Sequence, residues 1–221
     1  MKWLLDYFHY RRVEKEQERF VKRVYYRDAT FFQMDQALLS RYIFCSPYRI
    51  SKSYLKKEHA DDFFTYGETP LKTYDKIAKE VGLTSEDHVL ELGCGRGRGI
   101  FFLSHFYRCQ VSGIERIPQF VKLATHIAGK FQIQNVSFTC GDMLASFWPK
   151  ATFIYLYGTC LCDEEIHKVI DKLQDFPKGT RILSVSYPLT DYDPSVSFEL
   201  KKSFPIVFPW GETDAYFHVK T

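Results

Sequence analysis

The spacing of apolar residues changes near residue 65 of this chain. In residues 2–27 and 30–45, apolar side chains recur every three or four positions, which predicts two amphipathic helices. The stretch CSPYRISKS at 45–53 interrupts this spacing with a proline and serines, and we expect a connector there. We therefore predict that residues 1–65 form a helical N-terminal extension or lid on a domain made by residues 66–221.

After residue 70, short apolar runs alternate with stretches of helical spacing. The runs predict buried strands at 88–92, 110–115, 136–142, 152–158 and 181–187. Helices are expected around them, at 70–83, 99–107, 118–130 and 164–173. Two last extended runs, at 203–208 and 215–220, have no helix between them and predict an antiparallel hairpin. This alternation is typical of a three-layer α/β fold with a mostly parallel sheet, in which ligands bind at the carboxyl ends of the strands.

Composition and charge narrow the function classes. The chain has 221 residues, of which 45% are hydrophobic, enough to bury a core. Its net charge of +3 is too small to indicate a nucleic-acid partner. No apolar run approaches the ~20 residues of a membrane span, and the N-terminus lacks the features of a secretory signal. We expect no membrane partner.

Cysteine usage points to a reducing compartment. The six cysteines show no paired framework, which favours reduced thiols and a cytoplasmic location. The pair Cys160-x-Cys162 lacks the second pair or histidine cluster that a metal site needs, so no metal is expected.

Basic residues are concentrated in the first 65 positions. Two interpretations of this segment stay open: a helical lid packed on the main domain, or a platform that grips a polar or anionic partner. The platform would use the basic residues Arg11, Arg12, Lys22, Arg23 and Arg27.

The stretch HVLELGCGRGRGI at 88–100 places four glycines at alternate positions after an apolar run. Glycines allow a tight turn and the close approach of a ligand, and the following helix offers unpaired N–H groups. Arg98 stands where a dinucleotide-binding fingerprint needs glycine or alanine, and no Gly-Lys-Ser/Thr of a phosphate-binding loop is present. What remains is an acid, Glu91, before three spaced glycines: Gly93, Gly95 and Gly97.

This pattern resembles motif I of the class I S-adenosylmethionine-dependent methyltransferases. Two further acids follow the next two strands: Glu115 and Asp142. An acid at the position of Glu115 can accept hydrogen bonds from both ribose hydroxyls. The resemblance implies that Asp142 lies near the adenine amino group and that Glu91 organises the loop around the methionine moiety. It also implies S-adenosyl-L-methionine as the cofactor and a Rossmann-like three-layer methyltransferase sheet.

A closer resemblance begins upstream. The segment TYGETP at 65–70 resembles the Tyr-Gly-Glu-Thr loop of the disruptor-of-telomeric-silencing histone lysine methyltransferases. The likeness runs over about residues 64–220, through DHVLELGCGRG, GIER, GDM and the tail FPWGETDAYFH. It implies further cofactor contacts at Tyr66, Gly67, Glu68, Thr69, Cys94 and Met143. The chain departs from the family after the fourth strand, where LYGTC replaces a pair of asparagines and supplies Tyr157.

The resemblance implies an enzyme that passes the methyl group directly to a protein lysine side chain. No catalytic residue is assigned; Tyr157 and Tyr216 are candidates for the walls of the substrate channel. An aromatic channel would desolvate the lysine ammonium and lower its pKa. Two alternatives stay open. One is a small-metabolite methyltransferase with the N-terminal helices as its lid, and the other is a non-catalytic cofactor-binding interaction module.

Overall fold

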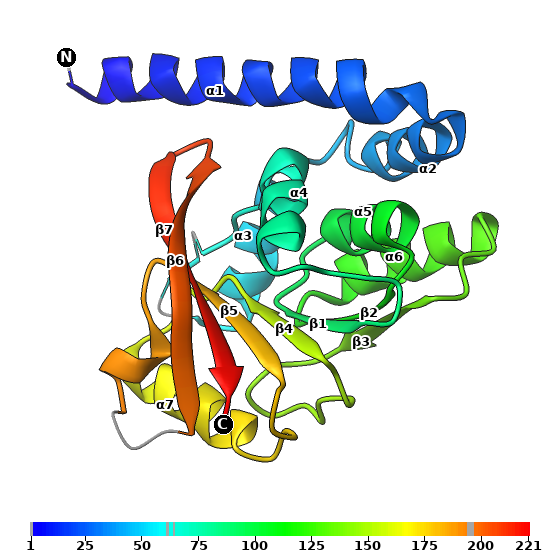
Figure 1. Ribbon diagram of the computed structural model, residues 1–221. Coiled ribbons are helices and arrows are strands. Elements are labelled where there is room, and N and C mark those ends of the chain that lie inside the picture. The colour runs from blue at the N-terminus through cyan, green and yellow to red at the C-terminus, as the bar shows by residue number, and fades with distance from the viewer. Residues whose placement is uncertain (1, 61, 64, 194–196) are drawn as a thin grey trace.

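A seven-stranded sheet forms the centre of the molecule, with strand order β3-β2-β1-β4-β5-β7-β6 (Figure 1). The computed structural model describes residues 2–60, 62–63, 65–193 and 197–221, with side chains described from residue 10 onward. The strands are β1 (His88–Leu92), β2 (Gln110–Glu115), β3 (Val136–Cys140), β4 (Phe153–Leu156), β5 (Arg181–Val185), β6 (Phe198–Phe208) and β7 (Gly211–Lys220). The first five pair in parallel, and β7 runs antiparallel to both β5 and β6. The predicted fold class and C-terminal hairpin are confirmed.

Helices cover both faces of this sheet (Figure 1). Helices α4 (Leu71–Glu80), α5 (Arg98–Tyr107) and α6 (Pro118–Lys130) pack on one face, and α7 (Asp163–Leu173) packs on the other. Side chains of a strand alternate between the two cores. Along β4, Phe153 and Tyr155 join the core under α4–α6, whereas Ile154 and Leu156 join the core over α7. The four predicted helices of this region agree with the structure to within a few residues.

Three further helices precede the sheet: α1 (Lys2–Val24), α2 (Ala29–Ser40) and α3 (Pro47–Lys57). One short 3-10 turn, Tyr25–Arg27, lies between α1 and α2, and another, Leu189–Asp191, lies between β5 and β6. The prediction of a connector at 45–53 is wrong, because α3 occupies most of it. Ser46 caps α3 by accepting a hydrogen bond from the Arg49 N–H at 3.4 Å, and Pro47 takes the first helical position. Both residue types favour a helix start, so the signals that we interpreted as a break begin a helix instead.

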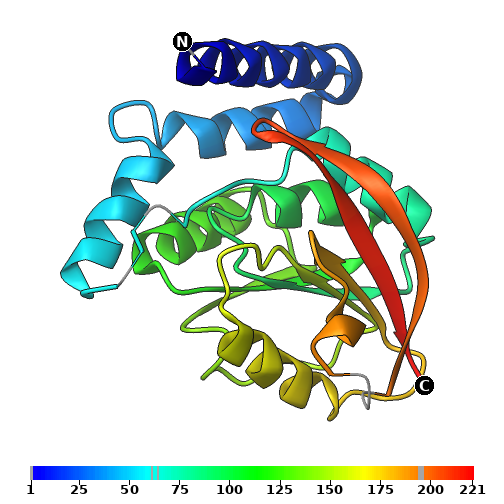
Figure 2. The same ribbon diagram turned by 90° about the vertical axis from the view of Figure 1, so that its left-hand side faces the viewer.

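The N-terminal helices differ in how deeply they are packed. Phe31 and Leu38 of α2 are fully buried and belong to the same core as Phe102 of α5 and Phe120 of α6. The rings of Phe31 and Phe102 are 5.9 Å apart in an edge-to-face arrangement, a favourable aromatic geometry. Helix α1 lies across the outside of these helices, and its N-terminal end extends beyond them (Figures 1 and 2). Within the part of the chain that is described, no helix combines the length and the apolar character needed to cross a membrane.

The C-terminal strand carries a buried histidine. His218 of β7 is 0% exposed, and its Nε2 accepts a hydrogen bond from the Leu189 N–H at 3.2 Å. Burial lowers the pKa of His218 to about 4, because the interior disfavours the charged imidazolium.

We expect His218 to make stability depend on pH. Between pH ~6.5 and ~4 the unfolded chain binds a proton at this residue that the folded chain does not, so stability falls as the pH falls. The loss should reach roughly 3 kcal/mol across that window. Urea unfolding of the wild type and of His218→Asn at pH 7 and pH 5 measures the part of this loss that occurs above pH 5, roughly 2 kcal/mol. A similar pH dependence in both proteins would contradict the assignment.

Candidate functional site

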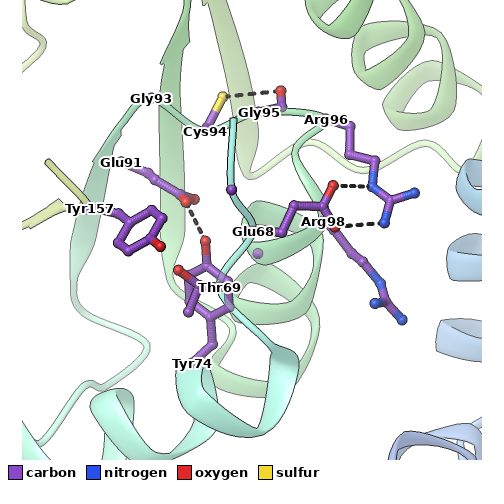
Figure 3. A pocket seen from close by; sticks show the side chains of 12 residues that line it. Glu68, Thr69, Tyr74, Glu91, Gly93, Cys94, Gly95, Arg96, Arg98 and Tyr157 are labelled. Atoms are coloured by element: carbon purple, nitrogen blue, oxygen red, sulfur yellow. Dashed lines mark hydrogen bonds and ion pairs between the residues drawn. The ribbon is translucent and has the colours of Figure 1, made fainter. Parts of the chain in front are cut away.

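The turn between β1 and α5 is built from glycines in the left-handed backbone region (Figure 3). Gly95 has a φ of +54°, and a Cβ there would lie 3.3 Å from the Tyr66 ring. Gly97 has a φ of +78°, and a Cβ there would lie 2.6 Å from Cε1 of Phe138. Side chains are strained by this backbone conformation and excluded by these neighbours. The glycine spacing therefore serves both a tight turn and close packing against the 66–69 segment.

The 66–69 segment crosses this turn and closes a pocket with it (Figure 3). The lining residues are Gly67, Glu68, Thr69, Tyr74, Glu91, Gly93, Cys94, Gly95, Arg96, Arg98, Gly99 and Tyr157. Seven of the predicted cofactor contacts meet here: Gly67, Glu68, Thr69, Glu91, Gly93, Cys94 and Gly95. Thr69 is held from behind, since its Oγ1 lies 2.6 Å from the Tyr155 hydroxyl. The two stretches named by the resemblance thus share one pocket.

Glu91 is the buried acid of this pocket. Its Oε1 accepts a hydrogen bond from the Tyr74 hydroxyl, and its Oε2 has no partner among the described residues. Burial raises the pKa of Glu91 to about 7. A buried carboxylate oxygen without a partner is costly, so it favours a ligand that donates to it. An ammonium group, such as the one on a methionine moiety, fits this oxygen in charge and in hydrogen-bonding capacity.

Glu115 closes β2 beside the glycine turn. Its two oxygens accept hydrogen bonds from the Gly95 N–H at 2.9 Å and the Ile117 N–H at 2.8 Å. Burial raises the pKa of Glu115 as well. The carboxylate therefore holds the turn in place, and each oxygen keeps a further lone pair for a ligand hydroxyl.

Asp142 and Met143 follow β3, the neighbour of β2. Asp142 is exposed and accepts a hydrogen bond from the Leu144 N–H at 2.7 Å, while Met143 packs on the core over α7. Neither lines the pocket, but the three acids Glu91, Glu115 and Asp142 end or follow three adjacent strands at the same edge of the sheet. A ligand that extends along this edge would pass all three.

Tyr157 lines the pocket opposite Gly67, whose Cβ, if it had one, would lie 3.1 Å from the tyrosine ring. The ring stacks on Phe208 at 4.8 Å, and Trp210 stacks on Phe208 at 5.1 Å. Trp210 Nε1 also donates a hydrogen bond to the Tyr157 hydroxyl at 3.0 Å. Tyr216 lies within β7, paired with Ser184 and Ser203, and is not among the pocket residues.

Sequence reasoning did not assign roles to several residues of this site. Trp210 and Phe208 entered only as part of the quoted tail, and Tyr74 only as part of a helix. Arg96 entered only as spacing between glycines and Arg98 only as a departure from the dinucleotide-binding fingerprint, yet both residues line the pocket. Arg96 pairs with Glu68, with Nη2 to Oε2 at 2.7 Å. Among the described residues, no group of three or more His, Cys, Asp or Glu side chains is placed to hold a metal ion.

The sequence of this chain matches a family described as "Methyltransferase domain" over residues 83–203. Curated relatives include a protein-L-isoaspartate O-methyltransferase of Thermosipho melanesiensis, 28% identical over 56% of this chain and 66% of the relative. The same enzyme of Pyrococcus abyssi is 31% identical over 46% of this chain and 47% of the relative. A sterol 24-C-methyltransferase of Eremothecium gossypii is 32% identical over 37% of this chain and 22% of the relative. The chain thus spans less than two thirds of these relatives.

Solved structures share the fold at low sequence identity. An RNA methyltransferase from Salinibacter ruber, in complex with S-adenosyl-L-homocysteine, has a TM-score of 0.57 and 22% identity, over 70% of this chain and 94% of that one. TrmN from Thermus thermophilus has a TM-score of 0.60 and 16% identity, over 78% of this chain and 52% of that one.

The glycine turn predicts unequal effects at two similar positions. Gly93 and Gly97 have φ values of +79° and +78°, but a Cβ meets nothing within 4 Å at Gly93 and meets Phe138 at Gly97. We expect Gly93→Ala to lose about 1 kcal/mol of stability from backbone strain alone. Gly97→Ala should lose about 1–3 kcal/mol more from overpacking. Urea unfolding measures both, and equal losses would contradict the role given to Phe138.

Proposed function

This chain belongs to the family of methyltransferase domains, and on that premise we propose that it binds S-adenosyl-L-methionine and transfers its methyl group directly to an acceptor. The observation that carries the proposal is the unpartnered, buried Oε2 of Glu91 in a pocket beside the glycine turn. The names of the relatives and the S-adenosyl-L-homocysteine in the Salinibacter ruber structure support the same cofactor.

In this proposal the residues of the pocket and those along the neighbouring strand edge each bind a part of the cofactor. Glu91 accepts hydrogen bonds from the methionine ammonium, and Glu115 accepts them from the ribose hydroxyls. Asp142 and Met143 lie beside the adenine, and the remaining contacts come from Tyr66, Gly67, Glu68, Thr69, Gly93, Cys94, Gly95 and Gly97. When bound, the cofactor supplies a methyl group already activated by its sulfonium. The protein then needs only to align the acceptor and exclude water, and no nucleophilic side chain is required.

We further propose a lysine side chain of a protein as the acceptor. Support comes from the aromatic wall in which Tyr157 and Trp210 stack on the buried Phe208, because the accessible part of an aromatic ring attracts an ammonium and the wall removes water from around it. Loss of water lowers the pKa of the amine, so that its lone pair becomes available. Trp210 is 51% exposed, which would give a side chain from another protein access to the wall.

A groove along α1 supports a protein partner. Residues of α1, α4 and β6 line it: Val13, Glu16, Gln17, Arg19, Phe20, Arg23, Lys72, Thr73, Lys76 and Val207. Four of these are basic and one is acidic, which favours an acidic partner. Val207 of the groove precedes Phe208 of the aromatic wall in β6, and the two side chains point to opposite faces of this strand. Of the platform residues that the sequence predicts, Arg23 lies in this groove and Arg11 pairs with Glu14 at 2.6 Å.

The relatives act on chemically different acceptors, since their names include a protein isoaspartate and a sterol. A small molecule is therefore the second candidate acceptor. It is favoured by the cover that α3 gives the 66–69 segment, where the rings of Tyr48 and Tyr66 are 5.2 Å apart. In that case the N-terminal helices would serve as a lid over the cofactor.

Cofactor binding should depend on the protonation of Glu91. Its pKa of about 7 in the free protein means that the carboxylate needed for the ammonium is lost as the pH falls below 7. We expect the affinity for S-adenosyl-L-homocysteine to fall up to about tenfold per pH unit below 7 and to rise only about twofold between pH 7 and 8, since half of the carboxyl is still protonated at its pKa. Calorimetry of the wild type and of Glu91→Gln at pH 6, 7 and 8 tests this.

Glu91→Gln should bind about tenfold more weakly at pH 8 and lose the pH dependence, because it cannot ionise. A wild type whose affinity does not change with pH would contradict the role of Glu91. Preference for a nicotinamide nucleotide over S-adenosyl-L-homocysteine would overturn the proposed cofactor.

The acceptor is tested by following a labelled methyl group. The protein is incubated with S-adenosyl-L-methionine labelled in the methyl group and with cell extract, and the extract is then separated into macromolecules and small molecules. We expect label in protein, recovered as methyl-lysine after hydrolysis. Reversing two groove charges, Arg19→Glu with Arg23→Glu, should reduce the labelling by about tenfold, since grouped charges at a docking surface act together. The matched control reverses Lys150 and Lys178, which lie outside the groove.

Label found only in small molecules would overturn the protein acceptor and favour a small-molecule acceptor, with the N-terminal helices as a lid. Equal labelling by the groove variant and its control would remove the groove from the proposal while leaving the lysine acceptor in place.

A further inference from the structure

We propose that Asp35 of α2 is a positioning residue for cofactor binding, acting through Arg98 at the end of the glycine turn. The proposal rests on the cofactor function proposed above. It gives the N-terminal segment an indirect part in the cofactor site, through Arg98, because Asp35 itself does not line the pocket.

Asp35 and Arg98 form a two-pronged ion pair across 63 residues of sequence. Arg98 Nε lies 2.8 Å from Oδ1, and Nη2 lies 2.7 Å from Oδ2. The Asp35 side chain is 1% exposed. The Tyr26 hydroxyl donates a further hydrogen bond to Oδ2 at 2.8 Å and is itself bonded by Gln36. Two parallel charge-assisted bonds fix the guanidinium in orientation as well as in position.

Arg98 needs such a partner because of where it lies. It is the first residue of α5, directly after Gly97, and a positive charge at a helix N-terminus opposes the helix dipole. It also lines the pocket with the carboxylates of Glu68 and Glu91. Burial lowers the pKa of Arg98, but Asp35 more than offsets this and raises it. Without Asp35, the guanidinium would be free to turn toward the pocket carboxylates and compete with the ligand ammonium.

The other arginine of the turn, Arg96, is also held by side chains from outside the turn. Arg96 pairs with Glu68 and lies over the Tyr42 ring, with its guanidinium carbon 5.2 Å from the centroid. The residues on both sides of Gly97 are therefore fixed by side chains outside the turn. A turn that is already ordered binds its ligand with a smaller loss of entropy.

The experiment measures S-adenosyl-L-homocysteine affinity by calorimetry at pH 8. We expect Asp35→Asn, which keeps the shape but removes the charge, to raise the Kd about tenfold or more. Tyr26→Phe removes one hydrogen bond to Asp35 and should raise the Kd about threefold. It also provides a folded variant should Asp35→Asn not fold. The matched control is Asp28→Asn at the start of the same helix. Asp28 accepts a hydrogen bond from the Phe31 N–H at 2.8 Å and does not line the pocket.

Asp28→Asn should keep its Kd within about twofold of the wild type, since asparagine also caps a helix and the change removes only the charge that faces His105 at 3.0 Å. The decisive comparison adds Arg98→Gln. In that background the Asp35→Asn change should alter the Kd by less than about twofold, because the two residues act as one unit. Equal effects of Asp35→Asn with and without Arg98, or no effect at all, would overturn the proposal. A wild type that binds no S-adenosyl-L-homocysteine would overturn the proposed function and this inference with it.

Discussion

The site depends on the turn that joins β1 to α5. The chain leaves a buried strand and enters a helix within a few residues. Gly93, Gly95 and Gly97 make this possible because each adopts a positive φ. The turn is held from several directions. The Glu115 carboxylate binds the Gly95 N–H, the Tyr66 ring lies against Gly95, and Phe138 lies against Gly97. A side chain at Gly95 or Gly97 would therefore disturb the turn and its neighbours at once.

Charge around this turn is almost completely paired. Glu68 is matched by Arg96, Arg98 by Asp35, and Glu115 by two backbone N–H groups. Among these carboxylates of the described residues, Glu91 differs, because Tyr74 satisfies only one of its oxygens. An unsatisfied buried carboxylate oxygen indicates where a ligand donor belongs. The unsatisfied oxygen identifies the ligand more specifically than the glycine spacing does, since glycine turns of this kind bind several classes of ligand.

The sequence predicted those features that depend on the residues of one short segment. Short apolar runs define β1, β4 and β5, which are buried on both faces. The prediction that β3 is buried is wrong, because its residues are exposed or half-buried. The acids that end or follow β1, β2 and β3 lie along one edge because parallel strands share their carboxyl edge. Helix α3 was missed because Ser46 and Pro47 favour both a break and a helix start, and only the residues that follow decide between them. The pairs Asp35–Arg98 and Tyr157–Trp210 join residues 63 and 53 positions apart. No spacing rule connects such distant positions, so these contacts required the structure.

The two interpretations of the N-terminal segment apply to different helices. Helix α2 is part of the body, since Phe31 and Leu38 are fully buried among residues of α5 and α6 and Asp35 reaches the cofactor turn. Its removal would expose a core and leave Arg98 unpaired, so it cannot act as a detachable platform. Among the side chains described from residue 10 onward, helix α1 contributes a few near its end to the core, such as Val21, and the helix lies outside the other helices (Figure 2). The two helices are separate elements, because the 3-10 turn Tyr25–Arg27 and the extended residue Asp28 lie between them. A partner bound to α1 would therefore contact an outer helix, while α2 holds the turn from within the core.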